Sequence, residues 1–272
     1  MRFNFGFIPG KKTLCNILFG WPKLIRKIQA SHIWKQLQIT PDDRFLDIGC
    51  GRANFTTEVA RVTRSVGVDI SFFNDVLQAK KLQSNLFLVA ADAVFLPFKK
   101  ESFTKILLGG TLQSVTNDSA VIEETFRVLE KDGTAVISVL VGHSGVKLFY
   151  DMEKKYPKIN QFLIELARIP KTFPEFEESY QKQLGLTRYY SIPELRKLVA
   201  RAGFEVREVH FSPNKIESIL FDWLLMIAVR MRLPLPNHPM YVIFYPLFLF
   251  IEKITGSNTA SGNEMLCIVQ KK

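Results

Sequence analysis

A glycine-containing turn follows a short apolar segment, and the sequence FLDIGCGRANF spans residues 45–55. Because Gly49 and Gly51 carry no Cβ, the backbone of this turn can approach a ligand closely. Asp47 would repel a phosphate in a partly desolvated crevice, whereas it would attract a positively charged ligand. The dinucleotide-binding motif also needs a third glycine, at the position of Asn54. The turn therefore favours a cationic ligand over a nicotinamide dinucleotide.

Two more carboxylates, Asp69 and Asp92, stand at the ends of predicted strands over 65–70 and 86–92. A single carboxylate of this kind is more often a strand-end residue or a helix cap than a ligand-binding group. The joint placement of Asp47 and Asp69 at the ends of successive predicted strands instead indicates one shared binding site.

Short apolar segments alternate with helix-like segments along the middle of the chain. Strands are predicted at 44–49, 65–70, 86–92, 105–110 and 134–140, and helices at 54–62, 74–82 and 120–129. This alternation predicts βαβ units and a parallel, doubly wound α/β sheet. Ligands of such sheets bind outside the carboxyl ends of the strands, where the three carboxylates are expected.

The flanking regions are predicted to be mostly helical. A helical lead-in covers 13–38 with a break near Pro22, helices follow at 144–155 and 158–168, and Ser191 begins a helix with a capping box that ends at 202–203. Strands are expected at 204–211 and 265–270. We expect a single domain over 1–272, with a lead-in (1–40), a cofactor-binding core (41–141), and acceptor-side helices and final strands (142–272).

Four motifs together resemble those of the class I S-adenosylmethionine-dependent methyltransferases. Residues 47–53 are similar to motif I, D/E-x-G-x-G-x-G, with alanine in the last position; 68–71 resemble the acidic motif after it; 91–98 resemble motif II; and 127–133 are similar to R-V-L-K-P-G-G, with Lys131 and Asp132 replacing proline and glycine. The resemblance covers roughly residues 40–141. It implies a Rossmann-like seven-stranded sheet, mostly parallel with a late antiparallel strand, and S-adenosylmethionine as cofactor.

The resemblance also implies roles for individual residues. Asp69 would accept hydrogen bonds from the ribose hydroxyls, Asp92 would lie at the adenine amino group, and Asp47 would face the charged methionine end. Arg52 would neutralise the cofactor carboxylate. The predicted cofactor-binding residues are Asp47, Gly49, Cys50, Gly51, Arg52, Asp69, Ile70, Asp92 and Ala93.

Methyl transfer from a sulfonium is an in-line displacement that depends mainly on alignment and needs no metal. His143, after the fifth predicted strand, is a candidate general base, although a loop histidine is commonly only solvated. Gln113, Tyr189 and Tyr190 are candidates for the acceptor pocket, with packing against the sheet as the alternative for the tyrosines. Cys50 is expected to be a small buried side chain and not a nucleophile.

The expected acceptor is a small molecule or a lipid-linked molecule. The segment after the fourth predicted strand lacks the Asn/Asp-Pro-Pro-Tyr signature of methyltransferases that act on nucleobase and glutamine amino groups, and no DNA partner is expected. The alternatives are a non-catalytic cofactor-binding protein, an RNA methyltransferase and an NAD-dependent oxidoreductase. A binding protein of the first kind would show no methyl transfer to any acceptor.

Charge and hydropathy suggest where the protein acts. The net charge of +10 suits nucleic acid or an anionic membrane surface. Three widely spaced cysteines indicate a reducing cytoplasmic compartment. The apolar segments 216–231 and 240–251 are too short to span a bilayer. They are expected either to contact the inner face of a membrane peripherally, or to cover the sheet edge or a dimer interface.

Overall fold

The centre of the computed structural model is a seven-stranded sheet with the order β3-β2-β1-β4-β5-β7-β6. The strands are β1 (Arg44–Ile48), β2 (Arg64–Asp69), β3 (Leu86–Ala90), β4 (Phe103–Gly109), β5 (Leu129–Leu140), β6 (Phe204–Phe211) and β7 (Glu264–Lys271). The first five run parallel, and β7 is antiparallel to both β5 and β6. The predicted sheet, mostly parallel with a late antiparallel strand, is confirmed.

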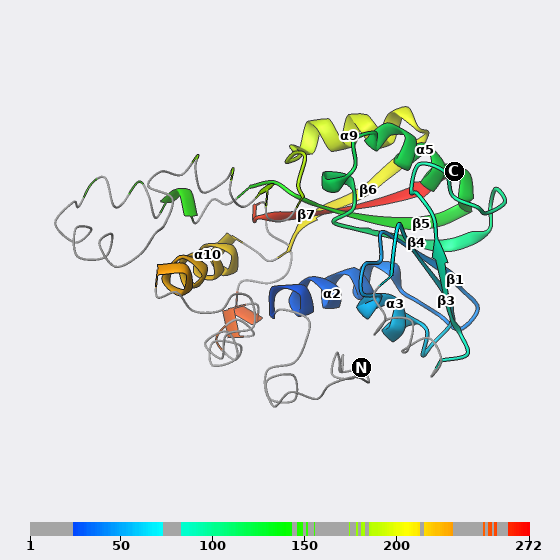
Figure 1. Cartoon of the computed structure of the whole chain (residues 1–272), viewed down its shortest axis with the longest axis horizontal. Helices are drawn as coiled ribbons and strands as arrows, with labels where there is room; N and C mark the ends of the chain where they lie inside the picture. Colours follow the sequence, from blue (N-terminus) through cyan, green and yellow to red (C-terminus); the bar gives the residue numbers. More distant parts are fainter. Residues whose placement is uncertain are drawn as a thin grey trace.

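The structure describes residues 24–72, 83–142, 185–212, 215–230 and 261–272, together with isolated positions between 146 and 182 and between 247 and 254. Its helices are α2 (Leu24–Leu37), α3 (Asn54–Val59), the 3₁₀ helix η1 (Leu112–Ser114), α5 (Asp118–Val128), α9 (Ile192–Arg201) and α10 (Lys215–Arg230). Figure 1 shows α5 and α9 on one face of the sheet and α2 and α3 on the other. The α10 helix lies beyond the edge at which β7 begins.

Both faces of the sheet are buried, which explains why its central strands are nearly continuous apolar segments. In β1, Leu46 and Ile48 belong to the larger core cluster, which includes side chains of α5 and α9. Phe45, which precedes Leu46 and points to the opposite face, packs into the second cluster with Leu37 of α2 and Val59 of α3. Successive side chains of one strand therefore anchor the two helical layers on opposite faces.

The predicted helix after Ser191 is confirmed at both ends. Ser191 Oγ accepts a hydrogen bond from the Glu194 N–H at 3.4 Å, and the Ser191 N–H donates to Glu194 Oε2 at 2.8 Å, which completes the capping box. Gly203 follows the helix with φ 99°, a conformation that favours glycine. Phe204 then stacks edge-on against Phe126 of α5 at 5.1 Å between ring centroids, so the cap places β6 beside the core.

Two boundaries within the described residues differ from prediction by three residues or more. The α3 helix ends at Val59, three residues before the predicted end at 62, because a hydrogen-bonded turn leads directly into β2. Strand β5 begins at Leu129, five residues before the predicted start at 134. Its register with β4 shifts between Phe103 and Lys105, and Asp132 there adopts φ 62°. Lys131 and Asp132, which replace the proline and glycine of the family motif, thus lie in an irregular part of a longer strand.

Several predicted elements lie wholly or largely outside the described residues, namely the helices at 74–82, 144–155 and 158–168, the lead-in before residue 24, and most of 240–251. Most of the apolar segment 216–231 lies in α10. Within the described part of the chain, no helix has the length and apolar character needed to cross a membrane.

Candidate cofactor and methyl-transfer site

The carboxyl ends of the parallel strands form one edge of the sheet, called here the carboxyl edge. Asp47 lies near the end of β1, Asp69 ends β2, and Asp92 follows β3. The strand register pairs Asp47 with Gly67 of β2, and Asp69 with Ala90 of β3. The three carboxylates predicted to share a site therefore do come from neighbouring strands at the carboxyl edge.

The glycine turn after β1 has left-handed backbone at alternate positions, with φ 72° at Gly49, 53° at Gly51 and 52° at Ala53. A Cβ at Gly49 would lie 2.3 Å from Thr111 Oγ1, whereas a Cβ at Gly51 would have no atom within 4 Å. Gly49 is thus required for packing, and Gly51 leaves open space in front of the backbone. Ala53 adopts the conformation of the glycine that motif I has at this position.

Asp69 links the glycine turn to the end of β2. Its Oδ2 accepts a hydrogen bond from the Gly51 N–H at 2.8 Å, and its Oδ1 accepts one from the Ile70 N–H at 2.9 Å. Each carboxylate oxygen can accept a second hydrogen bond, so Asp69 keeps the capacity to bind a pair of hydroxyls. The Ile70 side chain beside it is 76% exposed and presents an apolar surface suited to a flat ring.

Asp47 is nearly fully buried, and Thr56 Oγ1 of α3 donates a hydrogen bond to its Oδ2 at 2.6 Å. Burial raises the pKa of Asp47 to about 7; the bond from Thr56 opposes this shift, and the nearby charge of Asp69 adds to it. A cation arriving beside Asp47 would favour its ionised form. This carboxylate therefore suits a positively charged ligand, as its position in the sequence suggests.

Cys50 and Arg52 occupy the rest of the turn. The Cys50 N–H donates to the Val68 carbonyl at 2.9 Å, and a Cβ on Gly67 would lie 2.8 Å from Cys50 Sγ. Burial, with the charges of Asp47 and Asp69, raises the pKa of this thiol well above its usual range. The thiol stays protonated, in keeping with a packing role. Arg52 is partly exposed at the mouth of the turn, and its contact with a cofactor carboxylate stays a prediction.

The segment after β3 carries the motif II residues. Asp92 is exposed, and its Oδ1 accepts a hydrogen bond from the Val94 N–H at 3.1 Å. Ala93 is buried in the larger core cluster. The Ala91 N–H donates to the Asp69 carbonyl at 3.0 Å, so this segment begins directly beside the end of β2. Asp92 thus lies at the carboxyl edge with its side chain accessible to a ligand.

Gln113 and Tyr190, two candidates for the acceptor pocket, connect the ends of β4 and β5. Both are buried; Gln113 Oε1 accepts from the Leu140 N–H at 2.8 Å, and the Tyr190 N–H donates to the Leu140 carbonyl at 3.0 Å. The Tyr190 hydroxyl donates to Asp118 Oδ2 at 2.8 Å, and burial followed by this bond raises the pKa of Tyr190. These hydrogen bonds hold Gln113 and Tyr190 against the end of β5. Contact of either side chain with an acceptor stays a prediction.

The structure does not bring all the acceptor-side candidates together. Tyr189 is half-buried and, together with Tyr190, lines a shallow cavity of about 260 Å³ between α5 and α9, which Lys197 and Arg201 also line. His143 lies outside the described residues. Among the described residues, no cluster of His, Cys, Asp or Glu could hold a metal ion.

Two contributors escaped prediction. Thr56, in the first turn of α3, donates a hydrogen bond to Asp47. In the sequence, the only sign of this contact is a hydroxyl side chain near the start of an otherwise amphipathic helix. Thr111, after β4, donates from Oγ1 to the Ile48 carbonyl at 2.6 Å and fills the space in front of Gly49. Neither partner is near its target in sequence, so the contacts appear only once the strands are assembled.

Comparison with known proteins gives consistent matches. Residues 46–137 match the family model of a methyltransferase domain. Demethylmenaquinone methyltransferase of Staphylococcus haemolyticus (strain JCSC1435) is 25% identical over 185 residues, covering 65% of this chain and 75% of the relative. The protein of the same name from Staphylococcus saprophyticus is 24% identical over 204 residues, covering 72% and 84% respectively.

Solved structures share the fold. Phosphoethanolamine N-methyltransferase 2 of Haemonchus contortus, in complex with S-adenosyl-L-methionine, aligns with a TM-score of 0.59 and 18% identity, covering 98% of this chain and 56% of that one. The [4+2]-cyclase SpnF aligns with a TM-score of 0.54 and 17% identity, covering 89% and 80%. At these identities the likeness concerns the fold alone, and one fold hosts different reactions.

The site and the comparisons agree. The matched segment contains the glycine turn, Asp69 and Asp92, and its donors and acceptors suit a cationic ligand that carries a pair of hydroxyls and a flat ring. The residues present therefore fit S-adenosylmethionine, which is the cofactor. Residues 46–137 of the chain thus form an S-adenosylmethionine-dependent methyltransferase domain.

Proposed function

We propose that this enzyme methylates a lipid-linked, quinone-type acceptor at a membrane surface. The observation that carries the proposal is the match to proteins named demethylmenaquinone methyltransferase, which extends over 75% and 84% of the lengths of two such relatives. Because these matches extend beyond a shared cofactor motif, they favour a related acceptor. The identities of 25% and 24% leave the acceptor to be tested directly.

The residues of the site divide the work of the reaction. When bound, S-adenosylmethionine supplies a methyl group whose bond to sulfur breaks as the bond to the acceptor forms, while the acceptor loses a proton. Asp47 would hold the cationic end of the cofactor, and Asp69 and Asp92 would fix its nucleoside. This alignment would supply much of the acceleration. His143 is our candidate for receiving the acceptor proton.

The surface of the carboxyl-terminal region supports an apolar partner. Leu247, Phe250 and Ile254 are in helical conformation, and the last two are 59% and 67% exposed. Leu247 is 40% exposed, so three apolar side chains of this region are exposed, and Lys253 is exposed as well. Apolar residues next to basic ones are typical of helices that bind at a membrane interface.

The α10 helix also has a polar side and an apolar side, because its described polar side chains point inward. Ser218 and Asp222 are fully buried, and they accept hydrogen bonds from the Asn263 main-chain and side-chain nitrogens at 3.1 and 2.8 Å. Ile216 is 52% exposed. Because Asn263 directly precedes β7, this contact fixes α10 at the carboxyl edge, where β7 begins beside the end of β5. The buried polar side chains of α10 thus face the residue that precedes β7, and its outer side is proposed to contact lipid.

The acceptor can be identified by isotope transfer. Purified protein is incubated with methyl-labelled S-adenosylmethionine and separate lipid, aqueous and RNA fractions of a cell extract. We expect label in the quinone part of the lipid fraction. Label confined to RNA or to water-soluble molecules would overturn the proposed acceptor, and cofactor binding without transfer to any fraction would indicate a non-catalytic binding protein.

Membrane contact can be tested by flotation with anionic and neutral vesicles at low and high salt. We expect co-flotation with anionic vesicles that weakens at high salt, because exposed charges are screened. The double variant Phe250→Ser, Ile254→Ser should lose it. Phe87→Ser is the matched control, since Phe87 is 37% exposed on β3, an edge strand of the sheet, beneath the guanidinium of Arg64. An unaltered protein that ignores all vesicles would refute the membrane contact.

A further inference from the structure

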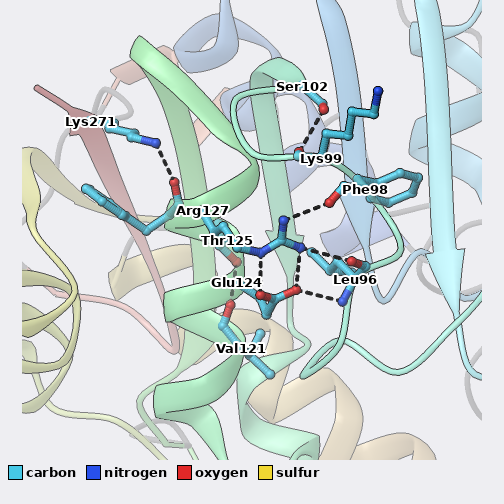
Figure 2. Close-up of polar contacts among 10 residues, drawn as sticks. Leu96, Phe98, Lys99, Ser102, Val121, Glu124, Thr125, Arg127 and Lys271 are labelled. Carbon is cyan, nitrogen blue, oxygen red and sulfur yellow. Dashed lines mark hydrogen bonds and ion pairs between the residues drawn. The ribbon is translucent and has the colours of Figure 1, made fainter.

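The Arg127 guanidinium, near the end of α5, lies at the centre of a polar network that holds the segment between β3 and β4 (Figure 2). Its Nη1 donates to the Phe98 carbonyl at 2.7 Å, and its Nη2 donates to the Leu96 carbonyl at 2.9 Å. The same side chain binds Glu124 with two hydrogen bonds, from Nε at 2.6 Å and from Nη2 at 2.7 Å. One planar cation therefore joins α5 to two consecutive turns of the segment 91–102.

Glu124 completes this arrangement from the preceding turn of α5. Its Oε2 accepts a hydrogen bond from the Leu96 N–H at 2.8 Å, so the Leu96 peptide groups are held on both the donor and the acceptor side (Figure 2). Its hydrogen bond with Arg127 lowers the pKa of Glu124 and keeps this acceptor ionised at neutral pH. The two side chains act as one unit, called here the Arg127–Glu124 clamp.

The clamped segment contains no helix or strand of its own. Main-chain bonds hold its far end, where the Glu101 N–H donates to the Arg127 carbonyl at 2.9 Å and the Ser102 N–H to the Val128 carbonyl at 2.8 Å. Its near end begins at Ala91, bonded to the Asp69 carbonyl. Between these ends, the Arg127–Glu124 clamp supplies charged hydrogen bonds to the main chain, so the position of the segment depends strongly on it.

We propose that Arg127 is a positioning residue for the cofactor. It does not reach the carboxyl edge itself; it fixes the segment on which Asp92 and Ala93 lie, and thereby sets the fraction of molecules in which these two residues are ready to bind. A reduced fraction weakens the apparent affinity in proportion. This inference rests on the proposed roles of Asp92 and Ala93 in binding the adenine.

The solvent exposure of Arg127 and Glu124 allows their effect on the position of the segment 91–102 to be distinguished from an effect on global stability. The side chains of Arg127 and Glu124 are 37% and 19% exposed, and ion pairs of this kind contribute little to global stability. The end of α3 and the turn after it offer a matched control in Glu58 and Arg61, which form an ion pair of the same i,i+3 spacing at 2.9 Å, with 12% and 44% exposure. In the described structure Arg61 makes no hydrogen bond to the segment 91–102.

The test is calorimetry of S-adenosylmethionine binding to the full chain, with hydrogen exchange as the second readout. Arg127→Met is expected to weaken binding by about tenfold. Arg127→Lys should not restore it, because an ammonium cannot donate in a planar fork to Glu124 and two carbonyls. Arg61→Met should bind as the unaltered protein does. In Arg127→Met, amide exchange should accelerate within 95–100 while the melting temperature changes little.

The outcomes separate the two proposals. Failure of the unaltered protein to bind the cofactor would count against the proposed function itself. Normal binding by Arg127→Met would overturn the positioning role. If that variant does not fold, the unaltered protein decides: the Leu96 amide must be protected from exchange and must become more protected when cofactor binds. An amide that exchanges freely, or that ignores the cofactor, would overturn the inference.

Discussion

Affinity for S-adenosylmethionine should fall as the pH is lowered through about 7, because Asp47 must be ionised to attract a cation. In the cofactor-free protein, burial raises the pKa of Asp47 to about 7. A sulfonium and an ammonium nearby would lower that pKa, so the carboxylate must release its proton when ligand binds at lower pH. Binding and deprotonation are therefore linked.

The size of the effect follows from this linkage. If the cofactor lowers the pKa of Asp47 well below 6, apparent Kd is proportional to one plus the ratio of protonated to ionised Asp47. That factor is about 1.1 at pH 8, about 2 at pH 7 and about 11 at pH 6. The affinity should thus fall roughly tenfold from pH 8 to pH 6, equivalent to about 1.4 kcal/mol.

Isothermal titration calorimetry at pH 6, 7 and 8, in buffers with different ionisation enthalpies, measures both Kd and the protons released. We expect nearly one proton released per ligand at pH 6 and almost none at pH 8. Asp47→Asn should bind more weakly at pH 8, without the slope that Asp47 causes. A pH-independent Kd in the unaltered protein, or an unchanged slope in Asp47→Asn, would refute the assigned charge role.

Three further predictions concern stability and turnover. The pKa of Asp47 in the folded protein lies above its ordinary value of 3.8, so the free energy of unfolding of the cofactor-free protein should decline as pH rises from about 4 to 7. Asp47→Asn should remove that loss, which is about 4 kcal/mol at most. Denaturant titrations at pH 8 measure the difference. Gly49→Ala should destabilise the fold by more than about 2 kcal/mol, because the new Cβ would collide with Thr111 and the backbone there has a positive φ. Gly51→Ala should destabilise the fold by about 1 kcal/mol and mainly weaken cofactor binding. Equal melting curves for the two variants would contradict this prediction. His143→Ala should lower kcat by about a hundredfold or more with cofactor Kd unchanged, and an unchanged kcat would remove its role as base.

Local patterns in the sequence predicted the parts of the site that depend on a single strand or turn. Asp47 and Asp69 were predicted correctly as strand-end residues because apolar strands and the glycine turn are visible within a few residues. The capping box at Ser191 is likewise local, since both partners lie within one helical turn. Such features need no knowledge of how distant segments pack.

The remaining features depend on contacts between distant segments. The raised pKa of Asp47 comes from burial, which no short segment reveals. Gly49 is required because Thr111, from the end of β4, packs against it. Adjacent tyrosines look equivalent in the sequence, and both line the cavity between α5 and α9, yet Tyr190 is buried with its hydroxyl bonded to Asp118, whereas Tyr189 is half-buried. The pKa of Asp47, the need for glycine at position 49 and the different surroundings of the two tyrosines all depend on how the strands assemble into the sheet.

Direct observation of methyl transfer to a lipid quinone tests the central claim. The measurement is mass spectrometry of a demethylated quinone in anionic vesicles after incubation with the protein and S-adenosylmethionine that carries a trideuterated methyl group. We predict that the quinone gains one labelled methyl group for each adenosylhomocysteine formed, and that Asp69→Ala, which removes the carboxylate bonded to Gly51, abolishes both products. Bound cofactor with no labelled quinone would contradict the account.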